Sequence, residues 1–332
     1  MATRHTRIVD RVLTRLKFKQ LRLLVAIGKH RSIQNAAREL NISQPAATKM
    51  IKDLELDFEV RLFDRTNRGV VPTAFGDALI RHGKLIFAQV SNAAQELDDL
   101  IEGSSGRVVI GTLLAASPTL LPQAIERVLA ERPNVAVKVV EGTNEALMPA
   151  LRSGEIDMVV GRLPTHRHRS EITQEKLFDE RIVAVCGPGH PLAGRRAVTF
   201  EDLKPFGWIL PPVETSLRRQ LDKFFIDEDQ YFPAVMFESI SYLTNRAMLQ
   251  ARDLIGLFPV HVAEQDIAAG SLARIDWDVP FGTGPVGVSF RMHGRLSPAG
   301  EAMLDALRAA GRDLSCRPRG DDHKSAVVST GK

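Results

Sequence analysis

Two short amphipathic segments joined by a tight turn, within residues 32–54, constrain the fold of this chain most strongly. Ser32 can cap a first helix and Ser43 a second. Pro45 lies in the first turn of the second helix, where its missing N–H would be unbonded anyway. Apolar residues recur at helical spacing in both segments: Ile33, Ala36, Ala37 and Leu40, then Ala47, Met50, Ile51 and Leu54. The pattern predicts a helix-turn-helix whose second helix presents a polar and basic face.

This outward face has the chemistry that reads duplex DNA. A glutamine can pair with adenine through two bonds, and a lysine can reach a guanine edge or a phosphate. A short strand pair around residues 64–69 would form a basic wing, whose arginines suit phosphates or a narrow minor groove. Ser32, at a helix start, can hold a phosphate, although Ser32 and Ser43 can also serve only as caps. The candidate DNA contacts are Ser32, Ser43, Gln44, Pro45, Thr48, Lys49, Lys52, Arg65 and Arg68.

Charge is distributed unevenly along the chain. The net charge is +4, but residues 1–72 hold 15 Lys and Arg against 7 Asp and Glu, whereas the remainder holds 29 against 33. A basic head on a mildly acidic body indicates that the head meets a polyanion. The alternative is a solvated surface with a basic tail.

Helical patterns flank the helix-turn-helix on both sides. A first helix begins near Phe18, with Gly28 as its end signal, after a flexible basic arm at residues 1–16. Residues 75–103 repeat apolar side chains at nearly seven-residue steps without a proline. This spacing predicts a coiled-coil helix that pairs two chains, the alternative being a helix packed on its own domain.

Strands and helices alternate from residue 107 onward, which predicts a mainly parallel α/β architecture in two similar lobes. We therefore expect a winged helix-turn-helix domain at 17–74, a dimerisation linker helix at 75–103 and a two-lobed domain at 107–314. Lobe I would comprise 107–163 and 268–314, and lobe II 164–267. Residues 315–332 are polar and predict a disordered tail.

Several short elements together resemble the LysR-type transcriptional regulators. These elements are Ala36-Ala37, Ser43-Gln44-Pro45-Ala46, Leu54-Glu55, Leu62-Phe63-x-Arg65 and Thr73-x-x-Gly76, in the family's order and spacing. The resemblance extends from Phe18 to about Leu314. It implies a C-terminal effector domain of the type 2 periplasmic-binding-protein fold. Thr48-Lys49 departs from the usual Ser-Arg, and Glu59 stands where glycine is common.

The resemblance also implies partners. A dimer would bind an interrupted palindrome in double-stranded DNA, two dimers would form a tetramer, and RNA polymerase would be contacted. The segments 21–26 and 66–73 look most like the branch that regulates sugar-binding-protein and protocatechuate genes. A small organic anion would bind between the lobes. The loops that match the family's effector contacts supply Ser117, Thr143, Asn144, Arg162, Thr215 and Ser216. Each hydroxyl among them can alternatively be a helix cap.

Other classes of protein find little support. No run of about 18 apolar residues or secretory signal occurs, and two distant cysteines make no disulfide framework, so a reducing cytoplasm is the simplest compartment. No catalytic, metal or cofactor motif appears. His166 and His168 fit a solvated loop better than a metal site. The rival functions are an effector-binding enzyme fused to a DNA-binding head and a plain solute-binding protein.

Overall fold

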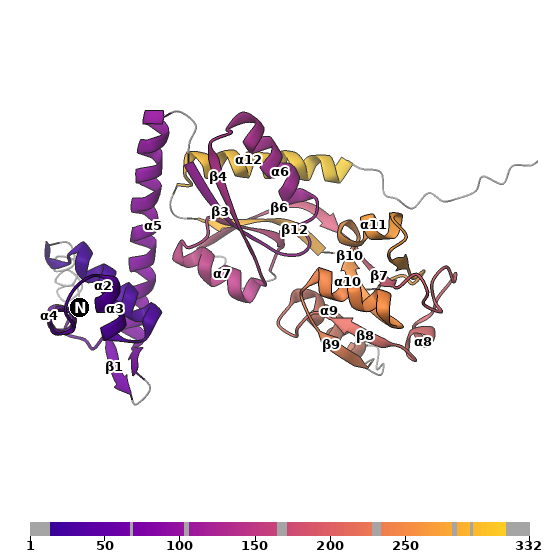
Figure 1. Cartoon of the computed structure of the whole chain (residues 1–332), viewed down its shortest axis with the longest axis horizontal. Coiled ribbons are helices and arrows are strands. Elements are labelled where there is room, and N and C mark those ends of the chain that lie inside the picture. Colours follow the sequence, from indigo (N-terminus) through magenta and orange to yellow (C-terminus); the bar gives the residue numbers. More distant parts are fainter. Residues whose placement is uncertain are drawn as a thin grey trace, which may run out of the picture. The chain divides into compact units, whose positions relative to one another are not determined.

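The computed structural model describes residues 14–66, 69–102, 106–164, 171–227, 234–280, 284–292 and 295–316. The described residues form two compact units. One holds those up to Leu97 together with Pro149–Ile156, and the other holds the rest. Most of the predicted arm and tail, and His166 and His168, lie outside the described residues. Figure 1 labels the helices and strands, and each unit is described separately below.

The first unit contains a winged helix-turn-helix, as the sequence predicts. Helices α2 (Phe18–His30), α3 (Ile33–Glu39) and α4 (Gln44–Phe58) precede an antiparallel pair, β1 (Phe63–Thr66) and β2 (Gly69–Pro72). Ser32 and Ser43 each cap the following helix, with hydroxyls that accept the N–H of Asn35 at 3.3 Å and of Ala46 at 3.4 Å. The core of this unit consists of Leu23, Leu24, Ala26, Ile27, Ala36, Ala37, Ala47, Ile51, Leu54, Leu62, Phe63 and Ile80.

Two helices in this unit end at a residue other than glycine that adopts the left-handed conformation. Gly28 does not end α2, which continues to His30 and closes at Arg31 in the left-handed region, with φ 52°. A Cβ at Gly28 would lie 2.8 Å from Cδ1 of Ile80, so this glycine permits close helix packing instead. Glu59 ends α4 with φ 59°, adopting the left-handed conformation that glycine usually supplies.

The long helix α5 (Ala74–Glu102) begins on a fixed junction with the wing. The hydroxyl of Thr73 donates to the carbonyl of Arg61 at 2.7 Å and accepts the N–H of Gly76 at 3.2 Å. A Cβ at Gly76 would lie 2.0 Å from the carbonyl oxygen of Leu62, so only glycine lets the helix start this close to the preceding backbone.

Gly76→Ala is therefore expected to destabilise the head by roughly 2–3 kcal/mol, because the backbone must move to admit a methyl group. Thermal unfolding followed by circular dichroism measures the effect. Gly189→Ala is the matched control, because a Cβ there meets nothing within 4 Å. Equal losses in the two variants would contradict the account of this junction.

The second unit contains two mixed α/β lobes. The lobe I sheet has the order β4-β3-β5-β12-β6, and the lobe II sheet has the order β11-β7-β10-β8-β9. Lobe I contains β3 (Gly106–Thr112), α6 (Leu120–Glu131), β4 (Val135–Glu141), α7 (Asn144–Ser153, whose residues from Pro149 group with the first unit), β5 (Met158–Arg162), β6 (Ile172–Glu180), β12 (Gly284–Arg291) and α12 (Pro298–Cys316). Lobe II contains β7 (Ile182–Cys186), α8 (Phe200–Leu203), β8 (Gly207–Leu210), α9 (Ser216–Asp227), β9 (Val235–Glu238), α10 (Tyr242–Ala251), β10 (Leu254–Pro259), α11 (Val260–Ala268) and β11 (Ala273–Arg274).

The sheets are less uniformly parallel than the sequence suggests. In lobe I, β3 pairs in parallel with β4 and β5, whereas β12 runs antiparallel to β5 and β6. In lobe II, β10 is parallel to β8 and antiparallel to β7. Helices α6 and α12 pack against the lobe I core (Figure 1).

The chain crosses between the lobes at other positions than expected near residues 164 and 268. Strand β6 belongs to lobe I, where it pairs with β12, and only Arg181 separates it from β7 of lobe II. The return crossing lies between Arg274 of β11 and Gly284 of β12. Lobe II therefore begins near residue 182 and extends past residue 268. The sequence pattern missed β6 because polar residues dominate it and one of its faces is exposed.

Candidate DNA-binding face and ligand cavity

The helix α4 separates an apolar face from a polar one. Ala47, Ile51 and Leu54 are buried in the core of the head. The predicted DNA contacts Ser43, Gln44, Pro45, Lys49 and Lys52 are exposed, and Thr48 is half-buried. The burial pattern therefore leaves a glutamine and two lysines accessible along one helix, which we call the recognition helix. Its width suits a major groove.

For the predicted DNA contacts in the wing and at the start of α3, the structure gives less information than for those in α4. Arg65 lies in β1, opposite Val70 of β2, and Arg68 lies outside the described residues. Ser32 is half-buried, and its hydroxyl already accepts the N–H of Asn35. Its capping role is thus present in the structure, and contact with a phosphate is a separate prediction.

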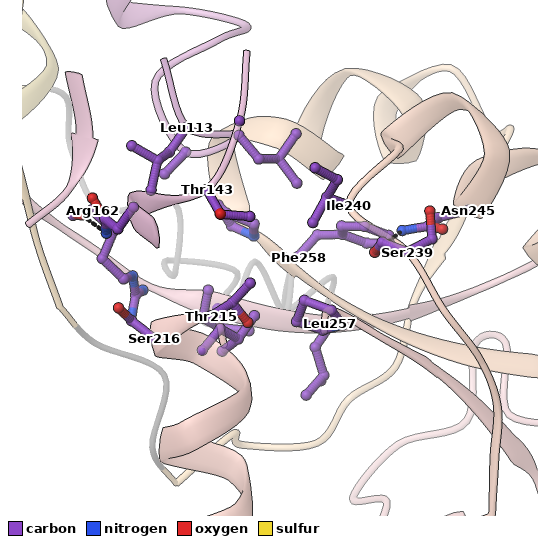
Figure 2. A pocket seen from close by; sticks show the side chains of 18 of the residues that line it. Leu113, Thr143, Arg162, Thr215, Ser216, Ser239, Ile240, Asn245, Leu257 and Phe258 are labelled. Atoms are coloured by element: carbon purple, nitrogen blue, oxygen red, sulfur yellow. Dashed lines mark hydrogen bonds between the residues drawn. The ribbon is translucent and has the colours of Figure 1, made fainter. Parts of the chain in front are cut away.

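A cavity lies between the lobes of the second unit (Figure 2). Its apolar lining includes Leu113, Leu114, Ala115, Ile182, Ile209, Leu217, Ile240, Leu257 and Phe258. Its polar lining consists of Glu141, Thr143, Asn144, Glu145, Arg162, Thr215, Ser216, Ser239 and Asn245. Five of the six predicted effector residues therefore meet here: Thr143, Asn144, Arg162, Thr215 and Ser216.

Ser117 is not among the lining residues. Its hydroxyl lies 3.4 Å from that of Thr112 and donates to the carbonyl of Leu113 at 3.4 Å, while its N–H donates to Leu114. The serine closes a turn, and the residues before it in the same loop line the cavity. Contact of Ser117 itself with an effector stays a prediction.

Arg162 supplies a buried positive charge at the end of β5. The residue is only 8% exposed, and its Nη1 donates to Oε1 of Gln220 at 3.0 Å. Glu180, 1% exposed, lies beside it at the end of β6. Burial raises the pKa of Glu180 to about 8, although Arg162 and the backbone N–H of His261 oppose that rise. Because Glu180 is then mainly protonated at neutral pH, it leaves the charge of Arg162 available.

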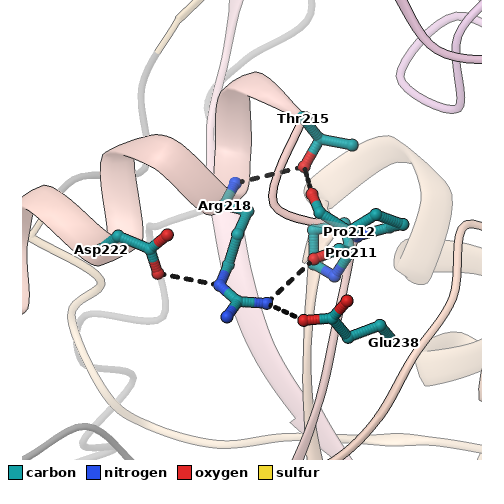
Figure 3. Close-up of polar contacts among 6 residues, drawn as sticks. All are labelled: Pro211, Pro212, Thr215, Arg218, Asp222 and Glu238. Atoms are coloured by element: carbon teal, nitrogen blue, oxygen red, sulfur yellow. Dashed lines mark hydrogen bonds and ion pairs between the residues drawn. The ribbon is translucent and has the colours of Figure 1, made fainter.

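The rim of the cavity at Thr215 is held by a buried arginine (Figure 3). The hydroxyl of Thr215 donates to the carbonyl of Pro212 at 2.8 Å and accepts the N–H of Arg218 at 3.3 Å. The Arg218 guanidinium donates to Asp222 at 2.8 Å, to Glu238 at 2.7 Å and to the carbonyl of Pro211 at 3.4 Å. Thr215 is thus a helix cap as well as a lining residue.

Sequence reasoning missed Arg218, Ser239 and Asn245. Arg218 lies in a charged stretch that is typical of solvated surface. Asn245 carried a usable signal, since it shares a buried helical face with Leu249, four residues on. A polar residue at such a position needs a partner or a ligand.

Other candidate chemistry finds little support in the described part of the chain. Cys186 is fully buried in β7, and burial raises the pKa of its thiol to about 11, which disfavours a reactive thiolate. No described helix combines the length and the apolar character needed to cross a membrane.

Comparisons with known proteins agree with this architecture. Residues 18–77 match the family described as "Bacterial regulatory helix-turn-helix protein, lysR family", and residues 102–312 match "LysR substrate binding domain". The HTH-type transcriptional regulator GbpR of Azospirillum brasilense is 35% identical over 89% of this chain and 87% of its own. The HTH-type transcriptional regulator PcaQ of Agrobacterium fabrum is 29% identical over 90% of this chain and 96% of its own.

Solved structures show the same fold. The LysR family transcriptional regulator CbnR is 20% identical, with a TM-score of 0.62 over 89% of this chain and 99% of its own. A full-length OxyR variant of Pseudomonas aeruginosa is 21% identical, with a TM-score of 0.63 over 90% and 95%. The two domain matches and the identity to curated regulators carry the assignment of function, which is that of a regulator and not of an enzyme. The chain belongs to the LysR family of DNA-binding transcriptional regulators and has an effector-binding domain.

Proposed function

We propose that this regulator binds an interrupted palindrome in cytoplasmic DNA as a dimer or tetramer, and that a small organic anion in the cavity modulates promoter binding or activation. The exposed polar face of the recognition helix, opposite an intact apolar face, is the observation that carries the proposal. RNA polymerase is the partner that activation would require. CbnR has also been solved in complex with its target DNA, which supports the same use of the head here.

The ligand half of the proposal rests on Arg162. A guanidinium that is buried at the edge of a mostly apolar cavity favours an anionic group. Both chain crossings lie next to this residue, because Val286 of β12 pairs with Arg162 and Gly284 pairs with Glu180. Ligand binding here would alter the lobe connection, provided that the ligand prefers one arrangement of the lobes over the other.

The DNA half predicts different effects for two side chains. Lys49→Ala is expected to weaken binding to all operator sequences, because one phosphate contact is lost. The slope of log affinity against log salt concentration should fall in magnitude by about 1. Gln44→Ala is expected to relax the base preference at one position by about 1–3 kcal/mol, because a bidentate base contact is lost. Footprinting of the region upstream of the chain's own gene, followed by salt titrations, measures both effects.

Lys138→Ala serves as the control, since it removes an exposed lysine from lobe I. Affinity and salt dependence that remain at wild-type values in both Lys49→Ala and Gln44→Ala would refute the proposed role of the recognition helix.

A further inference from the structure

Three buried polar atoms of the cavity residues lack hydrogen-bond partners within the described part of the chain. They are Nη2 of Arg162 and Oδ1 of both Asn144 and Asn245. All three residues line the cavity and are more than nine-tenths buried, with 8%, 8% and 4% exposure, respectively. Buried polar groups in folded proteins are almost always paired. Three such atoms at one cavity indicate the bonds that a ligand supplies.

The orientation of both amides is fixed by their other atom. Nδ2 of Asn245 donates to the carbonyl of Ser239 at 3.3 Å, and Nδ2 of Asn144 donates to the carbonyl of Arg162 at 3.2 Å. A flipped amide would set oxygen against oxygen, so Oδ1 is the free atom in each case. The cavity therefore offers a cationic donor and two neutral acceptors, and the acceptors require a ligand that carries O–H or N–H groups.

These groups lie at opposite ends of an apolar space. Figure 2 shows Arg162 on one side and Ser239 with Asn245 on the other, and side chains such as Leu257 and Phe258 lie between them. A ligand that reaches both ends must carry an apolar middle part, because a polar one would lose its hydration without compensation.

The charge of the lining limits the ligand to one negative group. Arg162 is the sole cationic residue among the described lining residues, which also include Glu141 and Glu145. Arg219 pairs with Glu145 at 3.2 Å, while Glu141 is exposed on the rim. A second carboxylate on the ligand would find no cation in the lining and would be repelled by a glutamate.

We propose that the cavity recognises a hydroxylated monocarboxylic acid with an apolar middle part. Its carboxylate accepts a hydrogen bond from Nη2 of Arg162, and its distal hydroxyl donates to Oδ1 of Asn245. This inference rests on the proposed function, since it names the class of ligand for the same effector site.

Calorimetric titration of the full-length protein with matched compounds tests the ligand class. The probes are 3- and 4-hydroxybenzoate, benzoate, 4-hydroxybenzyl alcohol, terephthalate, tyramine and gluconate. At least one hydroxybenzoate is expected to bind. Loss of the hydroxyl should weaken binding at least tenfold, and loss of the carboxylate at least 100-fold. Terephthalate and tyramine should bind worse than the better hydroxybenzoate.

Variants locate the two contacts within the cavity. Asn245→Leu is expected to reduce the preference for hydroxybenzoate over benzoate to about 1, while Arg162→Met should remove the preference for acid over alcohol. Asn245→Ser provides a second test should the leucine variant not fold, and Gln250→Leu, on the exposed face of α10, is the control. Each preference is a ratio within one variant, so a uniform loss of stability does not change it.

Five results would overturn the inference: no binding by either hydroxybenzoate, equal binding of benzoate, tighter binding of tyramine or the alcohol, tighter binding of gluconate, or an unchanged hydroxyl preference in both Asn245 variants. The gluconate result would show that the ligand needs no apolar middle part. Footprinting separates this inference from the proposed function. A hydroxybenzoate that binds as expected without changing the footprint or transcription would refute ligand control of the promoter and leave ligand recognition intact.

Discussion

Glu180→Gln is expected to stabilise the effector domain at alkaline pH and to leave it almost unchanged in acid. Burial raises the pKa of Glu180 from its ordinary 4.5 to about 8, so the folded state holds this proton more tightly than the unfolded chain does. The associated stability is complete below pH 4.5 and is lost as the pH rises through about 8. Glutamine resembles the protonated acid and loses nothing over that range. The expected difference at pH 9 is up to about 5 kcal/mol, at about 1.4 kcal/mol for each pH unit between the two pKa values.

Thermal and urea unfolding of both proteins between pH 4 and pH 9 measure this difference. Glu131→Gln is a suitable control, because Glu131 is exposed at the end of α6. Curves for wild type and Glu180→Gln that run parallel over the whole range would show that Glu180 is ionised in the folded protein. Arg162 would then be neutralised by Glu180 and would be a poor anion site.

Leu97→Asp in α5 is expected to prevent the proposed dimer and to weaken operator binding by more than about 100-fold, since both half-sites would be bound together. A stripe of α5 leaves large apolar side chains exposed within one chain, including Ile86, Val90, Leu97 and Ile101 at 40%, 49%, 60% and 79%. Burying a leucine contributes about 1.5–3 kcal/mol, and a twofold interface contains each residue twice. A charge in the stripe would remove that gain.

Sedimentation equilibrium gives the oligomeric state, and footprinting gives the affinity. Ser91→Asp introduces the same charge at an exposed position on another side of α5. If Leu97→Asp remains dimeric and binds DNA with wild-type affinity, this stripe is not the surface that pairs two chains. That result would favour the alternative, in which α5 packs only on its own domain.

The head could be predicted in detail because its signals are local. The spacing of Ala47, Ile51 and Leu54 defines one face of a helix, and Ser43 with Pro45 fixes where that helix begins. The prediction for Gly28 is wrong because a glycine near a helix end favours termination, whereas its role depends on Ile80, which is distant in sequence. Local patterns do not show which partner a glycine accommodates.

The effector domain was predicted less completely because its boundaries depend on pairing between distant strands. Strand β6 pairs within the lobe I sheet only with β12, more than 100 residues later in the chain. The residues of the cavity could likewise be predicted only in part from local sequence patterns. The position of loops after strands predicted Thr143 and Asn144, which line the cavity. The proximity of Glu180 to Arg162, and the unpartnered oxygen of Asn245, arise from the tertiary fold.

Selection of bound duplexes from a random DNA pool shows whether the recognition helix reads a palindromic operator, because the protein itself then selects its site among all sequences. The wild-type protein is expected to enrich an inverted repeat with an interrupted centre, and Gln44→Ala is expected to enrich a repeat with relaxed base preference at one position. An unenriched pool, or identical motifs from wild type, Gln44→Ala and Lys49→Ala, would contradict the proposed role of the recognition helix.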